Sequence, residues 1–313
     1  MAERPASGTS YTLRHGQYVA TIASVGASLR TLTFAGRDLV VPFDADEVRP
    51  AFRGVTLVPW PNRVVDGRYT FAGAEYQLAL TEPSRGHALH GLAVWLDYRA
   101  VDAGHDWVTL ETVIEPQVGY PWRARAEVTY RLTGAGLEQT VRAVNESATP
   151  APFGTGPHPY LVAGPGRVDD WTLELPAAQV LSVTPDRLVP TALEAVDASF
   201  DFRTPRAIAA TEIDHAFTGL SRDGDGVATV RVMDAGGQGV AMCWDAACPW
   251  VQIHTADLPG GAADPNHRAG LAVEPMTCGP DAFNAAQYDF DTGLIVLAPG
   301  GDAFASWRIS AIA

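Results

Sequence analysis

The sequence predicts an all-β protein built as a large antiparallel β-sandwich, and three observations support this fold class. Residues 123–132 alternate polar and apolar side chains with the period of a half-buried strand. Gly134-Ala135-Gly136 then turns the chain into a second extended run over 137–144. In addition, 30 glycines and 23 prolines among 313 residues interrupt almost every window that a long helix would need. Many short strands separated by such turns favour an antiparallel sandwich.

The remaining elements follow the same pattern along the chain. Ala72-Gly73 joins two extended runs, 68–71 and 74–78, into a second hairpin. Further strands are expected, in chain order, at 17–22, 30–34, 107–114, 227–233, 238–244, 250–254, 269–274, 294–297 and 304–311. One or two helical turns are expected around Pro280–Ala286. No repeat, low-complexity segment or change of composition marks a linker, so we predict one domain over residues 1–313.

Composition and charge exclude several classes of function. The chain has 22 Lys and Arg against 36 Asp and Glu, a net charge of −14, and such a surface repels phosphate backbones and anionic lipids. No segment approaches the ~20 apolar residues that span a bilayer, and the N-terminus lacks the apolar run of a secretory signal. Three cysteines are too few for a disulfide framework. We therefore expect a cytoplasmic protein that binds neither nucleic acid nor membrane.

Five places carry polar side chains that a β-sandwich does not need for folding. They are Asn62-Arg63 after two prolines, His87 and His90 among glycines, His158 in a Gly/Pro-rich loop, Asp214-His215, and Glu274. Taken singly, each has a structural or solvated role as its ordinary interpretation. Glu274 is the most informative, because it follows four small or apolar residues and precedes Pro275. Partial desolvation there would raise the pKa of its carboxyl toward that of a useful general base.

Other chemistries are less consistent with these residues. His87, His90, His158 and Glu274 contain the donor types of a zinc site. The His87-x-x-His90 pair, however, lies on a glycine-flanked segment without the helix that would direct both imidazoles to one side, and we expect no metal. The chain also lacks the Gly-x-Ser-x-Gly elbow of serine hydrolases and the Gly-x-Gly-x-x-Gly turn of dinucleotide-binding folds.

Seven short motifs in order give the chain a resemblance to the aldose 1-epimerase (galactose mutarotase-like) family, from about residue 11 to the C-terminus. They lie at 61–64 with 67–71, 88–91, 156–160, 213–217, 251–255, 273–275 and 280–284. The run Ala272-Val273-Glu274-Pro275-Met276-Thr277-Cys278 is similar to a bacterial subgroup distinct from the galactose enzymes. His254 also stands where galactose enzymes often carry an aromatic residue. These departures leave the identity of the sugar open.

The resemblance implies a supersandwich with an open cleft on one face, and an isomerase that interconverts sugar anomers without a cofactor. It implies that Glu274 is the general base and His158 the general acid. Their ordinary pKa values, about 4.3 and 6.5, leave both in the required protonation state at about pH 6. The residues implied to bind sugar hydroxyls are Asn62, Arg63, His90, Tyr160, Asp214 and Gln252.

Three questions stay open at the level of sequence. A sugar ring often stacks on an aromatic side chain, and the candidates near these motifs are Trp60, Trp95 and Trp250, each of which is equally consistent with core packing. An epimerase for an anionic sugar would need further cations at the cleft, for which the candidates are Arg53, Arg85 and Arg268. A non-catalytic sugar-binding protein on the same scaffold is the third alternative. The oligomeric state is not specified.

Overall fold

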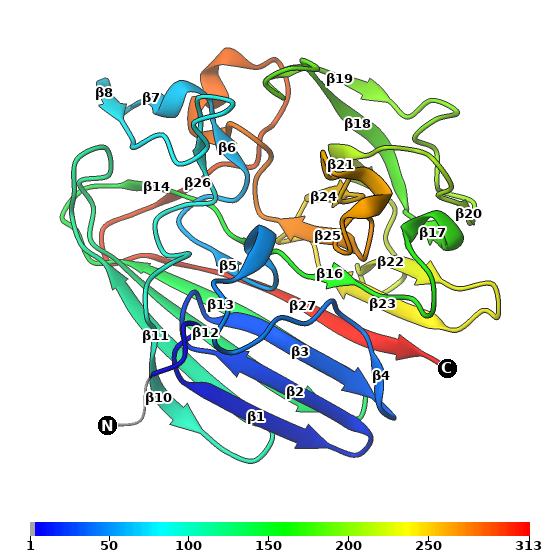
Figure 1. Ribbon diagram of the computed structural model, residues 1–313. Helices are drawn as coiled ribbons and strands as arrows, with labels where there is room; N and C mark the ends of the chain where they lie inside the picture. Colours follow the sequence, from blue (N-terminus) through cyan, green and yellow to red (C-terminus); the bar gives the residue numbers. More distant parts are fainter. Residues whose placement is uncertain (1–3) are drawn as a thin grey trace.

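The computed structural model describes residues 4–313 and consists of strands joined by turns and short 3-10 helices. Two large sheets dominate it (Figure 1). One has nine strands in the order β10-β11-β12-β13-β27-β23-β22-β17-β20, and the other has six in the order β16-β25-β24-β21-β18-β19. Every pairing within these sheets is antiparallel. The prediction of an all-β, antiparallel fold is confirmed.

The nine-stranded sheet contains the strands that were clearest in the sequence. Its strands are β10 (Arg99–Ala103), β11 (Trp107–Ile114), β12 (Ala124–Thr133), β13 (Gly136–Asn145), β27 (Asp302–Ile312), β23 (Gly239–Trp244), β22 (Ala228–Met233), β17 (Thr172–Glu174) and β20 (Arg206–Ala207). Along β12, buried residues alternate with partly exposed ones. This sheet therefore has one face in the core and one face toward solvent, as the period-two pattern predicted.

Four N-terminal strands form a separate antiparallel sheet in chain order: β1 (Ser10–His15), β2 (Tyr18–Ala23), β3 (Ser28–Phe34) and β4 (Arg37–Asp38). In Figure 1 this sheet lies in front of the part of the large sheet formed by β10–β13. Strands β1 and β2 contact β12, and Leu13 and Ile22 share one buried apolar cluster with Val108 and Val128. The core of this half of the molecule therefore lies between the two sheets.

The six-stranded sheet is covered on both faces near its centre. Its strands are β16 (Tyr160–Leu161), β25 (Leu271–Met276), β24 (Trp250–His254), β21 (Asp214–Leu220), β18 (Ala177–Val183) and β19 (Pro190–Ala195). All six residues of β25 are buried, as are four of the five in β24. Leu271 and Val273 of β25 belong to the main apolar cluster, together with Val251 and Ile253 of β24. Their neighbours in sequence must therefore point to the opposite face.

Short ladders and single turns connect the large sheets. The ladders pair β5 (Thr56–Leu57) with β15 (Gly156–Pro157), β6 (Arg63–Val64) with β9 (Ala88–Leu89), β7 (Arg68–Phe71) with β8 (Ala74–Gln77), and β14 (Ala151–Phe153) with β26 (Ile295–Leu297). The 3-10 turns are η1 (Pro50–Phe52), η2 (Val65–Gly67), η3 (Val168–Asp170), η4 (Gly261–Ala263) and η5 (Ala282–Gln287). Within residues 4–313, no helix has the length and hydropathy needed to cross a membrane.

The predicted strands all occur, with ends displaced by a few residues, and η5 corresponds to the helical turns expected near Pro280–Ala286. Among the strands of five or more residues, β1, β10, β18, β19 and β21 were not predicted, and neither were the strands of two residues or most of those of three. Three of these alternate poorly: β10 and β19 are largely exposed, and β18 has adjacent buried residues in place of strict alternation. In β21, Asp214 and Gly219 weaken the strand pattern, and pairing with β18 and β24 decides the structure there.

Candidate active site

Strand register brings polar residues from three strands to one face of the six-stranded sheet. Gln252 of β24 pairs directly with Glu274 of β25, and Asp214 of β21 pairs with His254 of β24. Residues two apart on a strand share a face, so Gln252 and His254 point the same way. Ile253, which lies between these two residues in the sequence, points the other way and belongs to the main apolar cluster. Tyr160 joins this face because it pairs with Ala272 on the other side of β25.

Asn62, Arg63 and His90 approach the same face from the small β6–β9 ladder. Arg63 pairs with Leu89, so His90 follows directly after the ladder. The backbone N–H of His90 donates to the carbonyl of Asn62 at 2.8 Å. Asn62 (φ 53°) and His90 (φ 64°) both have left-handed backbone conformations. Such conformations are uncommon outside glycine and tend to persist where surrounding contacts hold them.

His158 is held through its backbone just before β16. Its N–H donates to the carbonyl of Val55 at 3.0 Å, and its carbonyl accepts from Gly54 N–H at 2.8 Å. Gly54 has φ +66°, and a Cβ there would lie 2.0 Å from the carbonyl oxygen of Leu29. Only glycine therefore fits at this position, and its close approach to β3 fixes the segment to which His158 is bonded.

These elements enclose a cleft of about 340 Å³ that contains every predicted site residue. The eight predicted residues in its wall are Asn62, Arg63, His90, His158, Tyr160, Asp214, Gln252 and Glu274. The wall also includes residues that were not predicted as site residues, among them Phe52, Arg85, His254, Asp257 and Leu258. The structure thus brings together residues that are more than 200 positions apart in sequence.

At the floor of the cleft, an imidazole contacts a carboxyl group. His158 Nε2 lies 3.4 Å from Glu274 Oε1, and the two side chains are only 6% and 2% exposed. Among the residues that the structure describes, Glu274 Oε2 and His158 Nδ1 have no hydrogen-bond partner although both are buried. Buried polar atoms normally find partners, so these atoms are available to a ligand that enters the cleft.

Burial shifts the pKa values of this pair in opposite directions. Desolvation raises the pKa of Glu274 well above its ordinary value; the nearby Asp214 charge adds to this rise and Arg63 opposes it. Desolvation lowers the pKa of His158 to about 3, and the proximity of His254 contributes. Burial therefore disfavours the charged form of both groups, the carboxylate of Glu274 and the imidazolium of His158. The predicted rise for Glu274 is confirmed, but the expectation of a protonated His158 at about pH 6 is wrong, because the imidazole is fully desolvated.

His90 lies beside the pair and is also uncharged. Its ring centroid is 5.0 Å from that of His158 and 4.7 Å from that of Phe52, in edge-to-face contacts. Desolvation lowers the pKa of His90 well below its ordinary value, and the proximity of His158 and Arg63 adds to the shift. Its Nδ1 is buried without a partner among residues 4–313. The neutral ring presents one further polar atom that a ligand can satisfy.

The other predicted binding residues are oriented by specific hydrogen bonds. Gln252 Nε2 donates to Asp214 Oδ1 at 2.7 Å, and Gln252 Oε1 is buried with no partner in the described part of the chain. The Tyr160 hydroxyl donates to the carbonyl of Ala51 at 3.2 Å, which leaves its oxygen able to accept. Such fixed donors and acceptors in a small cleft are typical of sites that bind a polyhydroxylated molecule.

Phe52 lies in the wall of the cleft beside the predicted Tyr160, and the sequence analysis did not single it out. Trp60 and Trp250 are 2% and 1% exposed and belong to the core. Trp95 is 53% exposed but lies outside the wall, with Arg49 packed over its ring at 4.5 Å. Phe52 reaches the cleft because it and Ala51 take left-handed conformations in η1. Nothing in the sequence around Phe52 signals that turn.

Of the three arginines considered for an anionic sugar, only Arg85 lines the cleft. Arg53 is buried and donates to Asn266 Oδ1 at 2.7 Å, while Arg268 is buried between Asp169 and Asp257 at 3.0 and 2.7 Å. Arg85 is 37% exposed and donates to Glu82 at 2.9 Å. The cleft therefore has one partly solvated cation beside the buried Arg63.

His87 does not point toward the cleft. Its Nδ1 accepts from the Asp66 N–H at 3.2 Å, and its Nε2 lies 2.8 Å from the carbonyl oxygen of Arg187. Both ring nitrogens are thus engaged in holding the backbone, so His87 and His90 do not converge on one point. Among residues 4–313, no group of three or more His, Cys, Asp or Glu side chains is arranged to hold a metal ion.

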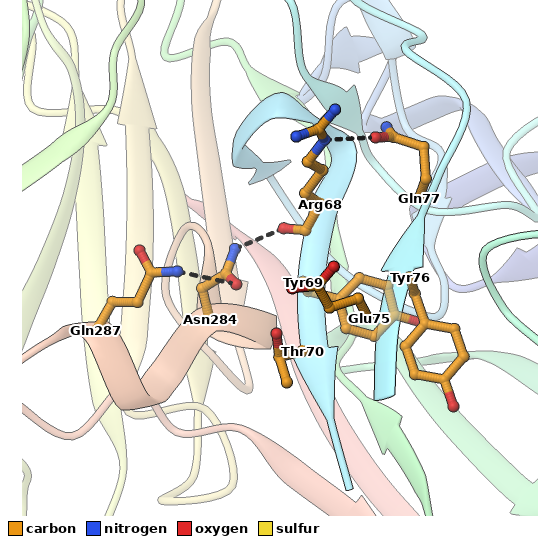
Figure 2. Close-up of a pocket in the computed structure, with 8 residues that line it drawn as sticks. All are labelled: Arg68, Tyr69, Thr70, Glu75, Tyr76, Gln77, Asn284 and Gln287. Atoms are coloured by element: carbon orange, nitrogen blue, oxygen red, sulfur yellow. Dashed lines mark hydrogen bonds between the residues drawn. The ribbon is translucent and has the colours of Figure 1, made fainter. Parts of the chain in front are cut away.

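A larger hollow of about 580 Å³ lies elsewhere, between the β7–β8 hairpin and η5 (Figure 2). Several of its polar groups bond to one another: Arg68 Nε donates to Gln77 Oε1 at 2.8 Å, and Asn284 Nδ2 donates to the carbonyl of Arg68 at 2.8 Å. None of its eight lining side chains, within the described residues, has a buried polar atom without a partner. The smaller cleft is therefore the stronger candidate for chemistry.

Comparison with known proteins defines the class to which this fold and cleft belong. The family model for aldose 1-epimerase matches residues 9–309, and the chain belongs to that family. It is 38% identical over 281 residues to an uncharacterized protein, YihR, of Escherichia coli K12, covering 89% of this chain and 87% of the relative. It is 26% identical over 320 residues to the galactose mutarotase of Mus musculus, covering 91% of each.

Solved structures support the fold. A putative aldose 1-epimerase from Escherichia coli K12 superposes with a TM-score of 0.80 at 23% identity, over 97% of this chain and 98% of that one. A GalM/aldose epimerase homologue from C. elegans superposes with a TM-score of 0.81 at 21% identity, over 97% and 100%. Family membership and this fold indicate an isomerase-type enzyme that acts on sugars.

Proposed function

We propose that this protein is an aldose 1-epimerase that interconverts the α and β anomers of a free aldose in the cleft, with Glu274 as general base and His158 as general acid. The observation that carries the proposal is the contact of 3.4 Å between these two buried groups, each of which keeps an unpartnered polar atom within the described residues. We further propose that residues 1–313 act as one domain.

The reaction requires only proton transfer. A base removes the proton from the anomeric hydroxyl, an acid protonates the ring oxygen, and the bond between C1 and the ring oxygen breaks to give the open-chain aldehyde. Rotation about the C1–C2 bond followed by reclosure, with the two roles reversed, yields the other anomer. One proton is taken up and one released in each direction, and no electrons are transferred. The chemistry therefore needs neither a redox cofactor nor a co-substrate.

The directions of the two pKa shifts indicate which group of the pair holds a shared proton. Burial disfavours both the Glu274 carboxylate and the His158 imidazolium, so a single proton on the pair favours Glu274 when no substrate is bound. The reacting arrangement has the same total but places that proton on His158 Nε2, 3.4 Å from Glu274 Oε1. A sugar hydroxyl that donates to the carboxylate, and a ring oxygen that accepts from the imidazolium, both favour this arrangement. We infer that substrate binding moves the proton within the pair.

The surrounding residues are assigned to binding. Arg63 and His90 are proposed to donate to the oxygen that develops negative charge as the ring opens. Asn62, Tyr160, Asp214 and Gln252 are proposed to bind the other hydroxyls, because their side chains line the cleft. Phe52 offers an apolar ring surface in the same wall.

A neutral aldose is favoured over an anionic one by the charges around the cleft. Arg63 and Arg85 line it, but so do Asp214 and Asp257, and the whole chain carries a net charge of −14. The second candidate, an epimerase for a phosphorylated or sulfonated sugar, is favoured by one observation: the partly exposed guanidinium of Arg85 at the wall of the cleft. A non-catalytic sugar-binding protein is less consistent with the retained His158–Glu274 contact.

A screen of freshly dissolved anomers separates these candidates. The rate of mutarotation would be followed by polarimetry for glucose, galactose, xylose and the 6-phosphates of the two hexoses, with Glu274→Gln protein as the matched control. We expect acceleration above the uncatalysed rate for at least one neutral aldose. A kcat/KM at least tenfold higher for a phosphate would replace the first candidate by the second. Sugar binding without acceleration of any aldose would support the non-catalytic alternative.

A further inference from the structure

Glu82 holds Arg63 in the wall of the cleft through a two-point ion pair. Arg63 Nε donates to Glu82 Oε2 at 2.8 Å, and Arg63 NH2 donates to Glu82 Oε1 at 3.1 Å. Each side chain is 10% exposed, so water competes little with these bonds. Burial alone would raise the pKa of Glu82, but the guanidinium groups of Arg63 and Arg85 outweigh it and hold that pKa below its ordinary value. Two parallel hydrogen bonds fix the plane of the guanidinium as well as its position.

Glu82 acts on the cleft only through its neighbours. Arg63 lines the cleft, whereas Glu82 is not among the residues of its wall. With Nε and NH2 engaged, NH1 is the remaining nitrogen of Arg63, and its single contact in the described structure is a long one of 3.4 Å to Asn62 Oδ1. The carboxylate therefore determines which edge of the guanidinium faces a bound ligand.

The position of Glu82 is itself fixed by a tight turn. Its carbonyl accepts from the N–H groups of Gly86 and His87 at 2.8 and 3.2 Å, and its N–H donates to the carbonyl of His87 at 3.0 Å. The buried His87 ring ties this turn to the backbone at Asp66 and Arg187. The carboxylate is thus anchored independently of Arg63, as a group that positions another residue has to be.

The same carboxylate sets the charge balance of the cleft. Glu82 Oε1 also accepts from Arg85 NH1 at 2.9 Å, so one negative charge is shared by the two arginines of the wall. The wall also contains the carboxyl side chains of Asp214 and Asp257, and that of Glu274, whose charged form is disfavoured by burial. Acidic side chains thus accompany both arginines of the wall, and Glu82 places one further negative charge in direct contact with them.

We propose that Glu82 is the positioning residue for Arg63 and the charge determinant of the cleft: it orients the guanidinium toward a neutral aldose and weakens the binding of anions. The positioning role of Glu82 rests on the proposed function, because it concerns the binding of an aldose. The charge role does not, because anion binding can be measured without turnover.

Three variants separate the positioning role of Glu82 from its charge role. Glu82→Gln removes both the charge and the two-point pair. Glu82→Asp keeps the charge on a shorter side chain that cannot maintain both bonds to Arg63. Glu146→Gln is the matched control, because Glu146 also bridges two arginines, Arg123 and Arg125, at 3.0 and 2.8 Å, but lies next to β13 in the nine-stranded sheet, outside the wall of the cleft.

Sulfate is the probe for charge, titrated calorimetrically at constant ionic strength. Glu82→Gln should bind sulfate on the order of tenfold more tightly than the wild type, because a unit charge a few ångströms away is removed from a partly desolvated site. Glu82→Asp and Glu146→Gln should bind it like the wild type. Equal sulfate affinity in Glu82→Gln and wild type overturns the charge role, whether or not any sugar is a substrate.

The KM for the preferred neutral aldose is the probe for positioning. Both Glu82→Gln and Glu82→Asp should raise it about tenfold, the size expected for loss of one charge-assisted hydrogen bond, with kcat changed less than threefold. Unchanged KM in both variants, or an equal rise in Glu146→Gln, overturns the positioning role.

If Glu82→Gln does not fold, Arg85→Gln tests the charge role in the opposite direction: sulfate should then bind more weakly than to the wild type, and unchanged binding contradicts the proposal. A wild type that accelerates no aldose refutes the proposed function but leaves the sulfate result decisive.

Discussion

The two large sheets of this protein use the same antiparallel pairing but surround their charged groups differently. On β12 of the nine-stranded sheet, buried residues alternate with partly exposed ones, and on its polar face Arg125 pairs with Glu111 and Glu146 at the surface. On β25 of the six-stranded sheet all residues are buried, and Glu274 lies in the cleft with 2% of its side chain exposed. One sheet keeps its charges solvated, and the other keeps an acid–base pair out of water.

This difference shows where stability and chemistry lie in the molecule. Surface ion pairs such as Arg125–Glu146 contribute little, because solvent screens them. The burial of Glu274 and His158 is unfavourable for their charged forms, so it raises the pKa of Glu274 and lowers that of His158. Ionisable groups with strongly shifted pKa values in a cleft are typical of functional sites. We therefore expect substitutions in the two sheets to affect different measured quantities.

The largest effect is expected from substituting the two proton carriers. Glu274→Gln removes the carboxyl that exchanges the proton, and His158→Asn removes the imidazole while keeping a hydrogen-bonding side chain. Each should lower kcat by roughly 10²–10⁴, the usual contribution of a general acid or base. The double variant should lose less than the product of the two, because both groups act in one transition state. Glu111→Gln on β11 is the control, and an equal loss of kcat in that variant would contradict the comparison.

A core substitution in the nine-stranded sheet should show the opposite pattern. Leu110 of β11 is completely buried in the main apolar cluster. Leu110→Ala should lower the free energy of unfolding by about 2–5 kcal/mol through lost burial and the cavity left behind. Urea denaturation measures this loss, and kcat per folded molecule should stay within twofold of the wild type. A large loss of kcat in the folded variant would show that the two sheets are not functionally separate.

Arg63→Lys should give an intermediate effect that is larger on substrate binding than on kcat, because lysine keeps the positive charge near the oxygen that develops negative charge. A lysine keeps the positive charge but replaces the rigid fork of donors that pairs with Glu82 by one ammonium group. We expect a normal unfolding transition and a KM raised roughly tenfold, corresponding to about 1.4 kcal/mol. Arg125→Lys, which changes a solvated pair of the nine-stranded sheet, should leave KM unchanged. Equal effects of the two substitutions on KM would contradict a binding role for Arg63.

Removal of metal ions by chelation should change the mutarotation rate less than any of these substitutions in either sheet. The proposed reaction moves only protons, and both ring nitrogens of His87 are engaged away from the cleft. The mutarotation rate measured by polarimetry should be the same before and after exhaustive dialysis against EDTA. A rate that is lost on dialysis and restored by zinc would contradict the proton-only mechanism.

The contrast between the sheets also explains what the sequence could predict. Because only one face of β12 is buried, apolar and polar residues alternate in its sequence, and the Gly134-Ala135-Gly136 turn marks where the chain reverses. In β25 burial on both faces removes the alternation, so Glu274 was recognised by its position after an apolar run and by family resemblance. Membership of the eight predicted residues in one cleft was expected from that resemblance alone, since it depends on strand register.

Other features of the site could not be predicted, for identifiable physical reasons. Phe52 enters the cleft through left-handed conformations at two non-glycine residues, which have no sequence signature. The pairing of Glu82 with Arg63 joins residues 19 positions apart across irregular turns. The lowered pKa of His158 depends on complete burial by segments distant in sequence. Ordinary pKa values therefore gave the wrong protonation state for that residue.

The dependence of kcat/KM on pH tests the central claim that Glu274 and His158 share one proton in a desolvated cleft. The pKa of His158 is lowered to about 3, so the pair gains a second proton only in strong acid. The pKa of Glu274 is raised, so the pair loses its single proton only well above the ordinary carboxyl range. Since kcat/KM reports the free enzyme, it should be constant through mildly acidic pH and fall on the alkaline side as the pair is deprotonated.

Glu274→Gln decides whether that alkaline fall belongs to the pair. This variant lacks the group with the raised pKa, so its small residual kcat/KM should no longer fall on the alkaline side. In His158→Asn the residual kcat/KM should not fall there either, because the remaining Glu274 acts as a base only when it is ionised. The account is contradicted if wild-type kcat/KM declines below about pH 6.5, the ordinary histidine value. It is equally contradicted if Glu274→Gln keeps both the alkaline fall and a rate close to that of the wild type.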